Sequence, residues 1–169
     1  MCSRMYLRNV FQKLFGLSDD AARDIKKSLR ACGVDVSIRL PCVIEVPHRV
    51  EIYDNVSIAS YLHVWGNGSV VIGPRTMIAS HVAISSATHD PDSPEMYRTL
   101  IEAAVVIEND VWIGAHAVIF PGVVVGQHSV IAAGTIVRES VPAFSVVAGV
   151  PARIVRRKPV ERSISPNDQ

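Results

Sequence analysis

The chain has 169 residues, with 17 Lys and Arg against 16 Asp and Glu, and a formal net charge of +1. This length supports one domain with a long hydrophobic core, and we expect no second catalytic domain. The balanced charge gives no basic stripe of the kind that nucleic-acid binding needs, so we expect no nucleic-acid partner. Cys2, Cys32 and Cys42 lack CxxC spacing, which argues against a zinc ribbon or a disulfide framework and favours a reducing, cytoplasmic location.

Residues 1–32 are predicted to form an N-terminal helical cap. Basic and apolar positions alternate too closely here for a signal peptide or a membrane span. A helix would instead place apolar side chains on one face, which suits a cover for the open hydrophobic end of a solenoid. Weak peripheral contact with a membrane surface is the alternative. The residues that share this face are Tyr6, Leu7, Val10, Phe11, Leu14 and Phe15.

Residues 33–150 contain a six-residue repeat of small or β-branched apolar residues. Each unit supplies one short strand and one turn, three units close a triangular coil, and coils stack about 4.8 Å apart. The pattern predicts an all-β fold, a parallel β-helix of hexapeptide repeats, followed by a short C-terminal tail at 151–169. The repeat positions are Val34, Leu40, Val46, Ile52, Ile58 and Val64, then Ile72, Ile78 and Ile84, then Ile107, Ile113, Ile119, Val125, Ile131 and Val137.

Two interruptions break the repeat, and function tends to lie where regularity is given up. Two extra residues stand between Val64 and Ile72, near Asn67, where the Asn-Gly pair predicts a turn or bulge. A longer polar excursion predicts a projecting loop at about 88–105. His89 stands where this loop leaves the wall, and it is either a general base or a hydrogen-bonding cap of the loop.

Three segments carry a resemblance to a known family: ISSATHD, VVIENDVWIGAHAVIFPGVVVGQHSVIAAGTIVRESVP and VVAGVPARIVRR. Over roughly residues 50–157 the chain resembles the hexapeptide-repeat O-acetyltransferases, in particular the maltose, galactoside and surface-polysaccharide branch. The resemblance implies a left-handed β-helix and a homotrimer, with acetyl-CoA bound between neighbouring subunits. It also implies a sugar or polysaccharide-precursor hydroxyl as acceptor, and no metal.

The resemblance also implies roles for individual residues. His89 matches the general base, Asp90 either orients the His89 ring or contacts the acceptor, and the turn at Asn67 marks a second wall of the acceptor pocket. Ala115 stands where the galactoside branch often has Ser, so only its backbone N–H is available as an oxyanion donor. Arg138-Glu139 replaces a frequent Thr-Lys pair. The residues expected to bind CoA are Trp112, Gly114, Ala115, Ala132, Ala133, Arg138, Arg153 and Arg156.

Other functions are consistent with parts of the sequence. A γ-class carbonic-anhydrase-like enzyme would use histidines such as His81 and His116 at a subunit boundary, but Pro121 occupies the place of the second histidine, five positions after His116. A non-catalytic β-helix scaffold would keep the solenoid and lose the base. Within the acyltransferases, a xenobiotic acceptor is the alternative to a sugar.

Overall fold

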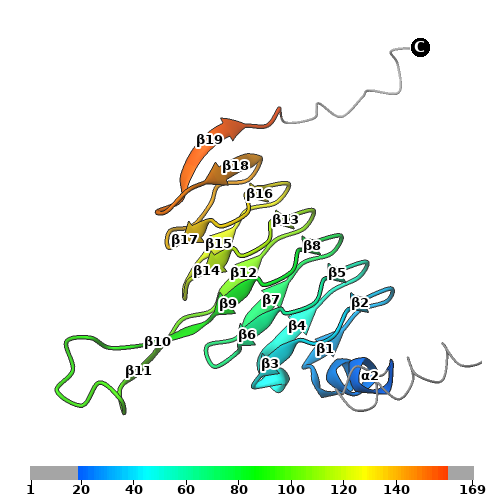
Figure 1. The fold of residues 1–169 in the computed structure, drawn as a ribbon, viewed down its shortest axis with the longest axis horizontal. Coiled ribbons are helices and arrows are strands. Elements are labelled where there is room, and N and C mark those ends of the chain that lie inside the picture. The colour runs from blue at the N-terminus through cyan, green and yellow to red at the C-terminus, as the bar shows by residue number, and fades with distance from the viewer. Residues whose placement is uncertain (1–18, 160–169) are drawn as a thin grey trace, which may run out of the picture.

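The computed structural model describes residues 19–159, which form a left-handed parallel β-helix of about six turns. Three parallel sheets, A, B and C, are the faces of a triangular prism (Figure 1). The predicted fold class is therefore confirmed.

Each coil contributes one short strand to each sheet. Sheet A contains β1 (Ala31–Cys32), β4 (Val50–Ile52), β7 (Val70–Ile72), β12 (Val105–Ile107) and β15 (Val124–Val125). Sheet B contains β2 (Ser37–Ile38), β5 (Ser57–Ile58), β8 (Met77–Ile78), β13 (Trp112–Ile113), β16 (Val130–Ile131), β18 (Ser145–Ala148) and the antiparallel β19 (Arg153–Arg157). Sheet C contains β3 (Val43–Glu45), β6 (His63–Trp65), β9 (Ala83–Ser85), β14 (Val118–Ile119) and β17 (Ile136–Val137).

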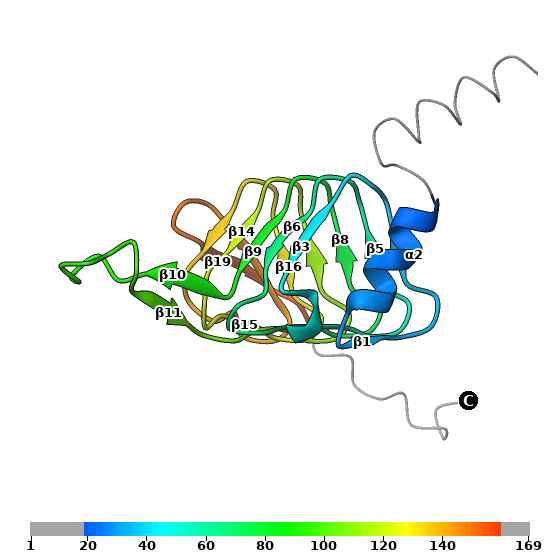
Figure 2. The same ribbon diagram turned by 90° about the horizontal axis from the view of Figure 1, so that it is seen from below.

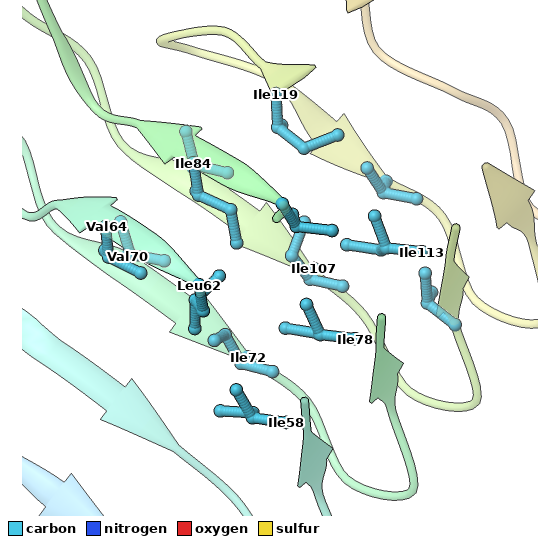
Figure 3. Close-up of a cluster of buried hydrophobic side chains, with 14 of the residues drawn as sticks. Ile58, Leu62, Val64, Val70, Ile72, Ile78, Ile84, Ile107, Ile113 and Ile119 are labelled. Carbon is cyan, nitrogen blue, oxygen red and sulfur yellow. The ribbon is translucent and has the colours of Figure 1, made fainter. Parts of the chain in front are cut away.

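The core lies along the axis of the prism, where the register stacks one inward residue of each strand on the next (Figure 3). Branched aliphatic side chains suit these short pleated strands, and burying each one contributes roughly 1.5–3 kcal/mol. The best-aligned residues are almost completely buried: Ile52, Ile72, Ile107 and Val125 under sheet A, Ile58, Ile78, Ile113 and Ile131 under sheet B, and Val64, Ile84, Ile119 and Val137 under sheet C.

The predicted register is wrong before Ile52. Val34 is 66% exposed, and the inward positions of the first coil belong to Ile38 and Ile44, in register with Ile58 and Val64. The cause is a 3-10 turn, η1 (Pro47–Arg49), which makes the step from Ile44 to Ile52 two residues longer than the repeat.

All the interruptions lie at one edge of the prism, the C–A corner, which joins sheet C to sheet A through residues 46–49, 66–69, 86–104, 120–123 and 138–140. The A–B corner (33–36, 53–56, 73–76, 108–111, 126–129) and the B–C corner (39–42, 59–62, 79–82, 114–117, 132–135) keep the six-residue step. The antiparallel hairpin of β10 (Ala87–His89) and β11 (Leu100–Glu102) projects from the C–A corner (Figures 1 and 2).

At the N-terminal end of the solenoid lies the helix α2 (Asp19–Ser28), beside β1 (Figure 2). Its Ile25 packs against the core cluster, and Leu29 just after it is buried. The apolar face predicted for residues 6–15 lies outside the described residues. No helix within 19–159 is long and apolar enough to cross a membrane.

Candidate active site

A pocket of about 430 Å³ opens at the C–A corner, between sheet C and the hairpin. Its walls come from the ends of β6 and β9, from the 66–69 turn and from the hairpin strands. The two interruptions found in the sequence therefore meet in one place, and His89 stands in that place. The lining residues are Trp65, Asn67, Ser85, Ala87, Thr88, His89 and Leu100.

The His89 ring is held by a backbone carbonyl. Its Nδ1 lies 2.8 Å from the Met96 carbonyl oxygen, across the loop. A carbonyl oxygen only accepts hydrogen bonds, so Nδ1 carries the ring proton of the neutral imidazole. Nε2 then keeps its lone pair, which is the form that a general base needs.

Asp90 is engaged with the loop and not with the His89 ring. Its Oδ1 accepts a hydrogen bond from the Asp92 N–H at 3.0 Å, and its own N–H donates to the Thr99 carbonyl at 3.1 Å. Among the described contacts, the partner that orients His89 is therefore Met96. A role of Asp90 toward an acceptor stays a prediction.

The base of the hairpin is fixed by Ser86, which is fully buried. Its hydroxyl donates to the Trp65 carbonyl at 2.7 Å and accepts from the Gly68 N–H at 2.9 Å, while its carbonyl accepts from the Ala103 N–H at 2.9 Å. A Cβ on Gly68 would lie 2.3 Å from the Ser86 carbonyl oxygen. Only glycine allows the short turn to pack this closely on the base of the loop.

Arg49 lies in η1, a third interruption of the repeat, and its side chain connects the 66–69 turn with the hairpin. Its Nη1 donates to the Asn67 carbonyl and lies 3.1 Å from Glu102 Oε2 on β11. The backbone of Asn67, which lines the pocket, is thus tied to the hairpin. Both ionic side chains are partly exposed, so this ion pair orders the corner more than it stabilises the fold.

Two of the predicted CoA-binding cations lie together. Arg138 and Arg153 line a second pocket, of about 340 Å³, between the end of β17 and the start of β19. The Arg138 guanidinium lies 5.6 Å from the centre of the Phe120 ring, and Arg153 Nη1 donates to the Ala152 carbonyl at 2.8 Å. Arg156, exposed on β19 opposite Val146, does not line this pocket.

The other CoA-binding candidates lie away from His89. Ala115 and Ala133 are at the B–C corner, which is separated from the C–A corner by the strands of sheet C, about 10 Å long. A Cβ on Gly114 would lie 2.5 Å from the Ala133 backbone nitrogen, so coil stacking alone requires glycine there. Ala132, beside Ala133, donates its N–H to the Val147 carbonyl at 2.9 Å. Trp112 is 50% exposed on the outer face of sheet B.

The histidines considered as metal ligands form a stacked ladder instead. The rings of His81 and His116 have centroids 4.7 Å apart and are nearly parallel, and Tyr61 stacks on His81 at 4.5 Å. Between residues 19 and 159 no group of three or more His, Cys, Asp or Glu residues is arranged to hold a metal ion.

Sequence reasoning missed three groups of the site. Trp65 carried a readable signal, since it is an outward aromatic residue immediately before the two-residue slip. Ser86 carried a weaker one, as a small polar residue two positions after the inward Ile84. Met96 contributes a backbone carbonyl, for which the identity of the residue gives no signal.

Comparison with known proteins agrees with this fold. The family model described as bacterial transferase hexapeptide (six repeats) matches residues 104–139. The WbbJ protein of Escherichia coli, provisionally named a lipopolysaccharide biosynthesis O-acetyl transferase, is 39% identical over 114 residues, 62% of this chain and 58% of that protein. A Saccharomyces cerevisiae protein, provisionally named an acetyltransferase, is 33% identical over 134 residues, 79% of this chain and 68% of that protein.

A solved structure extends the likeness to three dimensions. The hexapeptide-repeat acetyltransferase of Vibrio cholerae in complex with acetyl coenzyme A is 30% identical, with a TM-score of 0.69, over 84% of this chain and 79% of that one. The chain belongs to the hexapeptide-repeat acetyltransferase family. It spans between 58% and 66% of the length of the Escherichia coli relatives that it matches.

Proposed function

We propose that this protein transfers an acetyl group from acetyl-CoA to a hydroxyl of a sugar or surface-polysaccharide precursor. The observation that carries the proposal is the His89 imidazole, lining a pocket with its Nδ1 proton held by the Met96 carbonyl. The bound acetyl-CoA of the Vibrio relative supports the donor, and the name of WbbJ supports a saccharide acceptor.

The reaction needs one base and one oxyanion donor. His89 Nε2 accepts the hydroxyl proton as the acceptor oxygen attacks the thioester carbonyl, which gives a tetrahedral oxyanion. When the oxyanion collapses, the C–S bond breaks and the departing CoA sulfur takes the proton back from Nε2. The Met96 carbonyl stabilises the imidazolium that exists between these two steps.

Ala115 is the proposed oxyanion donor. Its carbonyl accepts a hydrogen bond from the Gly134 N–H at 2.8 Å, but its own N–H has no hydrogen-bond partner among the described residues. In one chain this N–H lies at the other edge of sheet C from His89. A second subunit would have to bring the two together.

We therefore propose a homotrimer with its sites between subunits. Large exposed hydrophobic side chains on the hairpin and on sheet B support this arrangement, because a single chain leaves them open to water. The hairpin of one subunit would cover sheet B of the next. These side chains are Met96 (50% exposed), Tyr97 (73%), Leu100 (42%) and Ile101 (45%) on the hairpin, and Met77 (53%) and Trp112 (50%) on sheet B.

For the donor, we propose that the CoA phosphates meet Arg138 and Arg153, whose guanidinium groups share a pocket. The pantetheine arm would pass Trp112 and the small residues of the B–C corner, Gly114, Ala115, Ala132 and Ala133. Arg156 would add positive charge from β19. A cytoplasmic location follows from the proposed donor and accords with the free thiols of Cys32 and Cys42.

Release of free CoA thiol from acetyl-CoA tests the proposal. Purified protein is offered methyl glycosides, then hydroxylated antibiotics, with a reaction lacking acceptor as the blank. We expect release that depends on a glycoside and saturates with it. Release of CoA thiol only with antibiotics would favour a xenobiotic acceptor. No release with any acceptor would contradict acetyl transfer and favour a non-catalytic scaffold.

A further inference from the structure

Trp65 stands beside the proposed base but has no part in the chemistry described above. It is on β6, at an outward position of sheet C, in register with Glu45 on one side and Ser85 on the other. It lines the same pocket as His89. An indole in the wall of a pocket offers a large flat apolar surface.

One face of this indole is already covered. The His63 ring, two residues earlier on the same strand, stacks on it with centroids 3.6 Å apart and planes 19° from parallel. His63 Nε2 lies in turn 3.3 Å from Glu45 Oε1, which holds the imidazole in place. His63 does not line the pocket, whereas Trp65 does. The imidazole therefore covers one indole face and leaves the opposite face as the one able to meet a ligand in the pocket.

Polar side chains line the same pocket as the indole. They are Asn67, Ser85, Thr88 and His89, and the remaining lining residues, Ala87 and Leu100, are apolar. Hydroxyl and amide groups around an apolar plate match a pyranose ring, which has C–H groups on its flat faces and hydroxyls around its edge. The electron-rich face of an indole attracts such weakly positive C–H groups.

We propose that Trp65 is the acceptor-binding platform, on which a pyranose ring lies flat so that one of its hydroxyls reaches His89 Nε2. This inference rests on the proposed acetyl transfer and narrows its acceptor to a cyclic sugar. Trp65 is a contact to the substrate, and His63 is a positioning residue that acts through Trp65.

Binding is measured with Trp65 as its own reporter. The chain has two tryptophans, Trp65 and Trp112. The parent is titrated with methyl β-galactopyranoside and methyl α-glucopyranoside, alongside Trp65→Phe, in which the fluorescence comes from Trp112 alone. Galactitol and glucitol are matched controls, because they carry comparable hydroxyls on an open chain.

We expect a saturable emission change with at least one pyranoside and none with the hexitols. Equal responses to pyranosides and hexitols, or no response to either, would overturn the platform.

Kinetic measurements distinguish acceptor binding by Trp65 from a merely structural role of this residue. We expect Trp65→Ala to raise KM for the methyl pyranoside about tenfold or more, with KM for acetyl-CoA unchanged. Trp65→Phe should recover part of this loss, and His63→Ala should show a smaller rise. Light scattering reports whether the oligomer is intact. A parental KM in Trp65→Ala, or parallel loss of the oligomer and of acetyl-CoA affinity, would overturn the proposal while acetyl transfer stands.

Failure of the proposed function has a different signature. If the parent releases no thiol with any acceptor, acetyl transfer itself is wrong. The fluorescence titration still decides whether Trp65 binds a pyranose, because it does not depend on turnover.

Discussion

The A–B corner and the C–A corner enclose the same core but are built differently. At the A–B corner every coil turns in six residues, and one residue of each turn takes a left-handed conformation with φ between 54° and 58°: Asp35, Asn55, Arg75, Asp110 and His128. At the C–A corner the steps are eight residues from Ile44 to Ile52, eight from Val64 to Ile72, and 23 from Ile84 to Ile107. The inward residues stay in register across steps of eight and 23 residues. The C–A corner can therefore be lengthened to carry a site without disturbing the core.

The polar contacts of the two corners also differ in purpose. At the A–B corner, Arg75 donates two hydrogen bonds of 2.6 Å to Asp110 and so fastens one coil to the next. At the C–A corner, Ser86 and Arg49 fasten coils too, but the segments they hold are the walls of the pocket beside His89. Substitutions at the two corners should therefore have separable effects on stability and on activity.

Apart from replacement of His89 itself, the largest effect is expected from Gly68→Val. The added side chain meets the Ser86 carbonyl, so the turn and the hairpin base must move apart. We expect about a hundredfold loss in kcat/KM from displacement of the pocket walls, and a loss of about 1–3 kcal/mol in unfolding free energy. The matched variant is Gly73→Ala at the A–B corner, where a Cβ lies 2.7 Å from Glu108. It should lose stability and keep its KM values, and equal kinetic losses in both variants would remove the distinction between the corners.

The donor end of the site should respond next. Replacing Arg138 and Arg153 together by Ala is expected to raise KM for acetyl-CoA about tenfold to a hundredfold with little change in kcat, as for contacts made equally in ground and transition states. Arg156→Ala should have a smaller effect, since this residue lies outside the shared pocket. A drop in kcat at unchanged KM would contradict the assignment.

Arg49→Ala should have a modest effect. It releases the Asn67 backbone from Glu102, and we expect kcat/KM to fall by less than about tenfold and unfolding free energy by less than about 1 kcal/mol. Arg30→Ala is the control, because Arg30 makes a comparable exposed ion pair with Glu51 on sheet A. Kinetic measurements in which both variants behave alike would show that Arg49 does not order the pocket.

Asp110→Asn is expected to leave the kinetic constants unchanged. The paired Arg75 lowers the pKa of Asp110 to about 2, with a further contribution from Asn109. A lowered pKa stabilises the folded state above the ordinary carboxyl pKa, and this contribution is lost as pH falls from about 4 toward 2. Thermal unfolding should show the variant less stable by about 1 kcal/mol at pH 7, a modest value because Arg75 is exposed, and the gap should close below pH 4. A gap that persists at pH 2 would show that the pair does not act through charge.

The fold was predictable from Ile52 onward because each strand adds an inward residue to a stacked column, and these columns accept only small or branched apolar residues. It was not predictable before Ile52, because the chain offers apolar residues in both phases. Val34 and Val46 continue the six-residue count, while Ile38 and Ile44 fill the core. The residues Pro47–Arg49 do not predict a turn that lengthens the step between inward residues by two.

The site was predictable to the extent that it is made of side chains at breaks in the repeat. His89 and Asn67 were found in this way, and they line one pocket. The Met96 carbonyl could not be found, since every residue has one. Nor could the sequence tell that Ala115 and His89 lie at opposite edges of sheet C, because the 23-residue step from Ile84 to Ile107 interrupts the count that assigns later residues to a corner.

The central claim, that the interrupted corner carries a general base, is tested most directly by the turnover rate of His89→Ala with saturating acetyl-CoA and a methyl glycoside. His128→Ala, on the regular A–B corner, is the control. We predict that kcat falls about a hundredfold to ten-thousandfold in His89→Ala, with CoA binding and thermal unfolding unchanged, and that His128→Ala turns over like the parent. Parental turnover by His89→Ala would contradict the account.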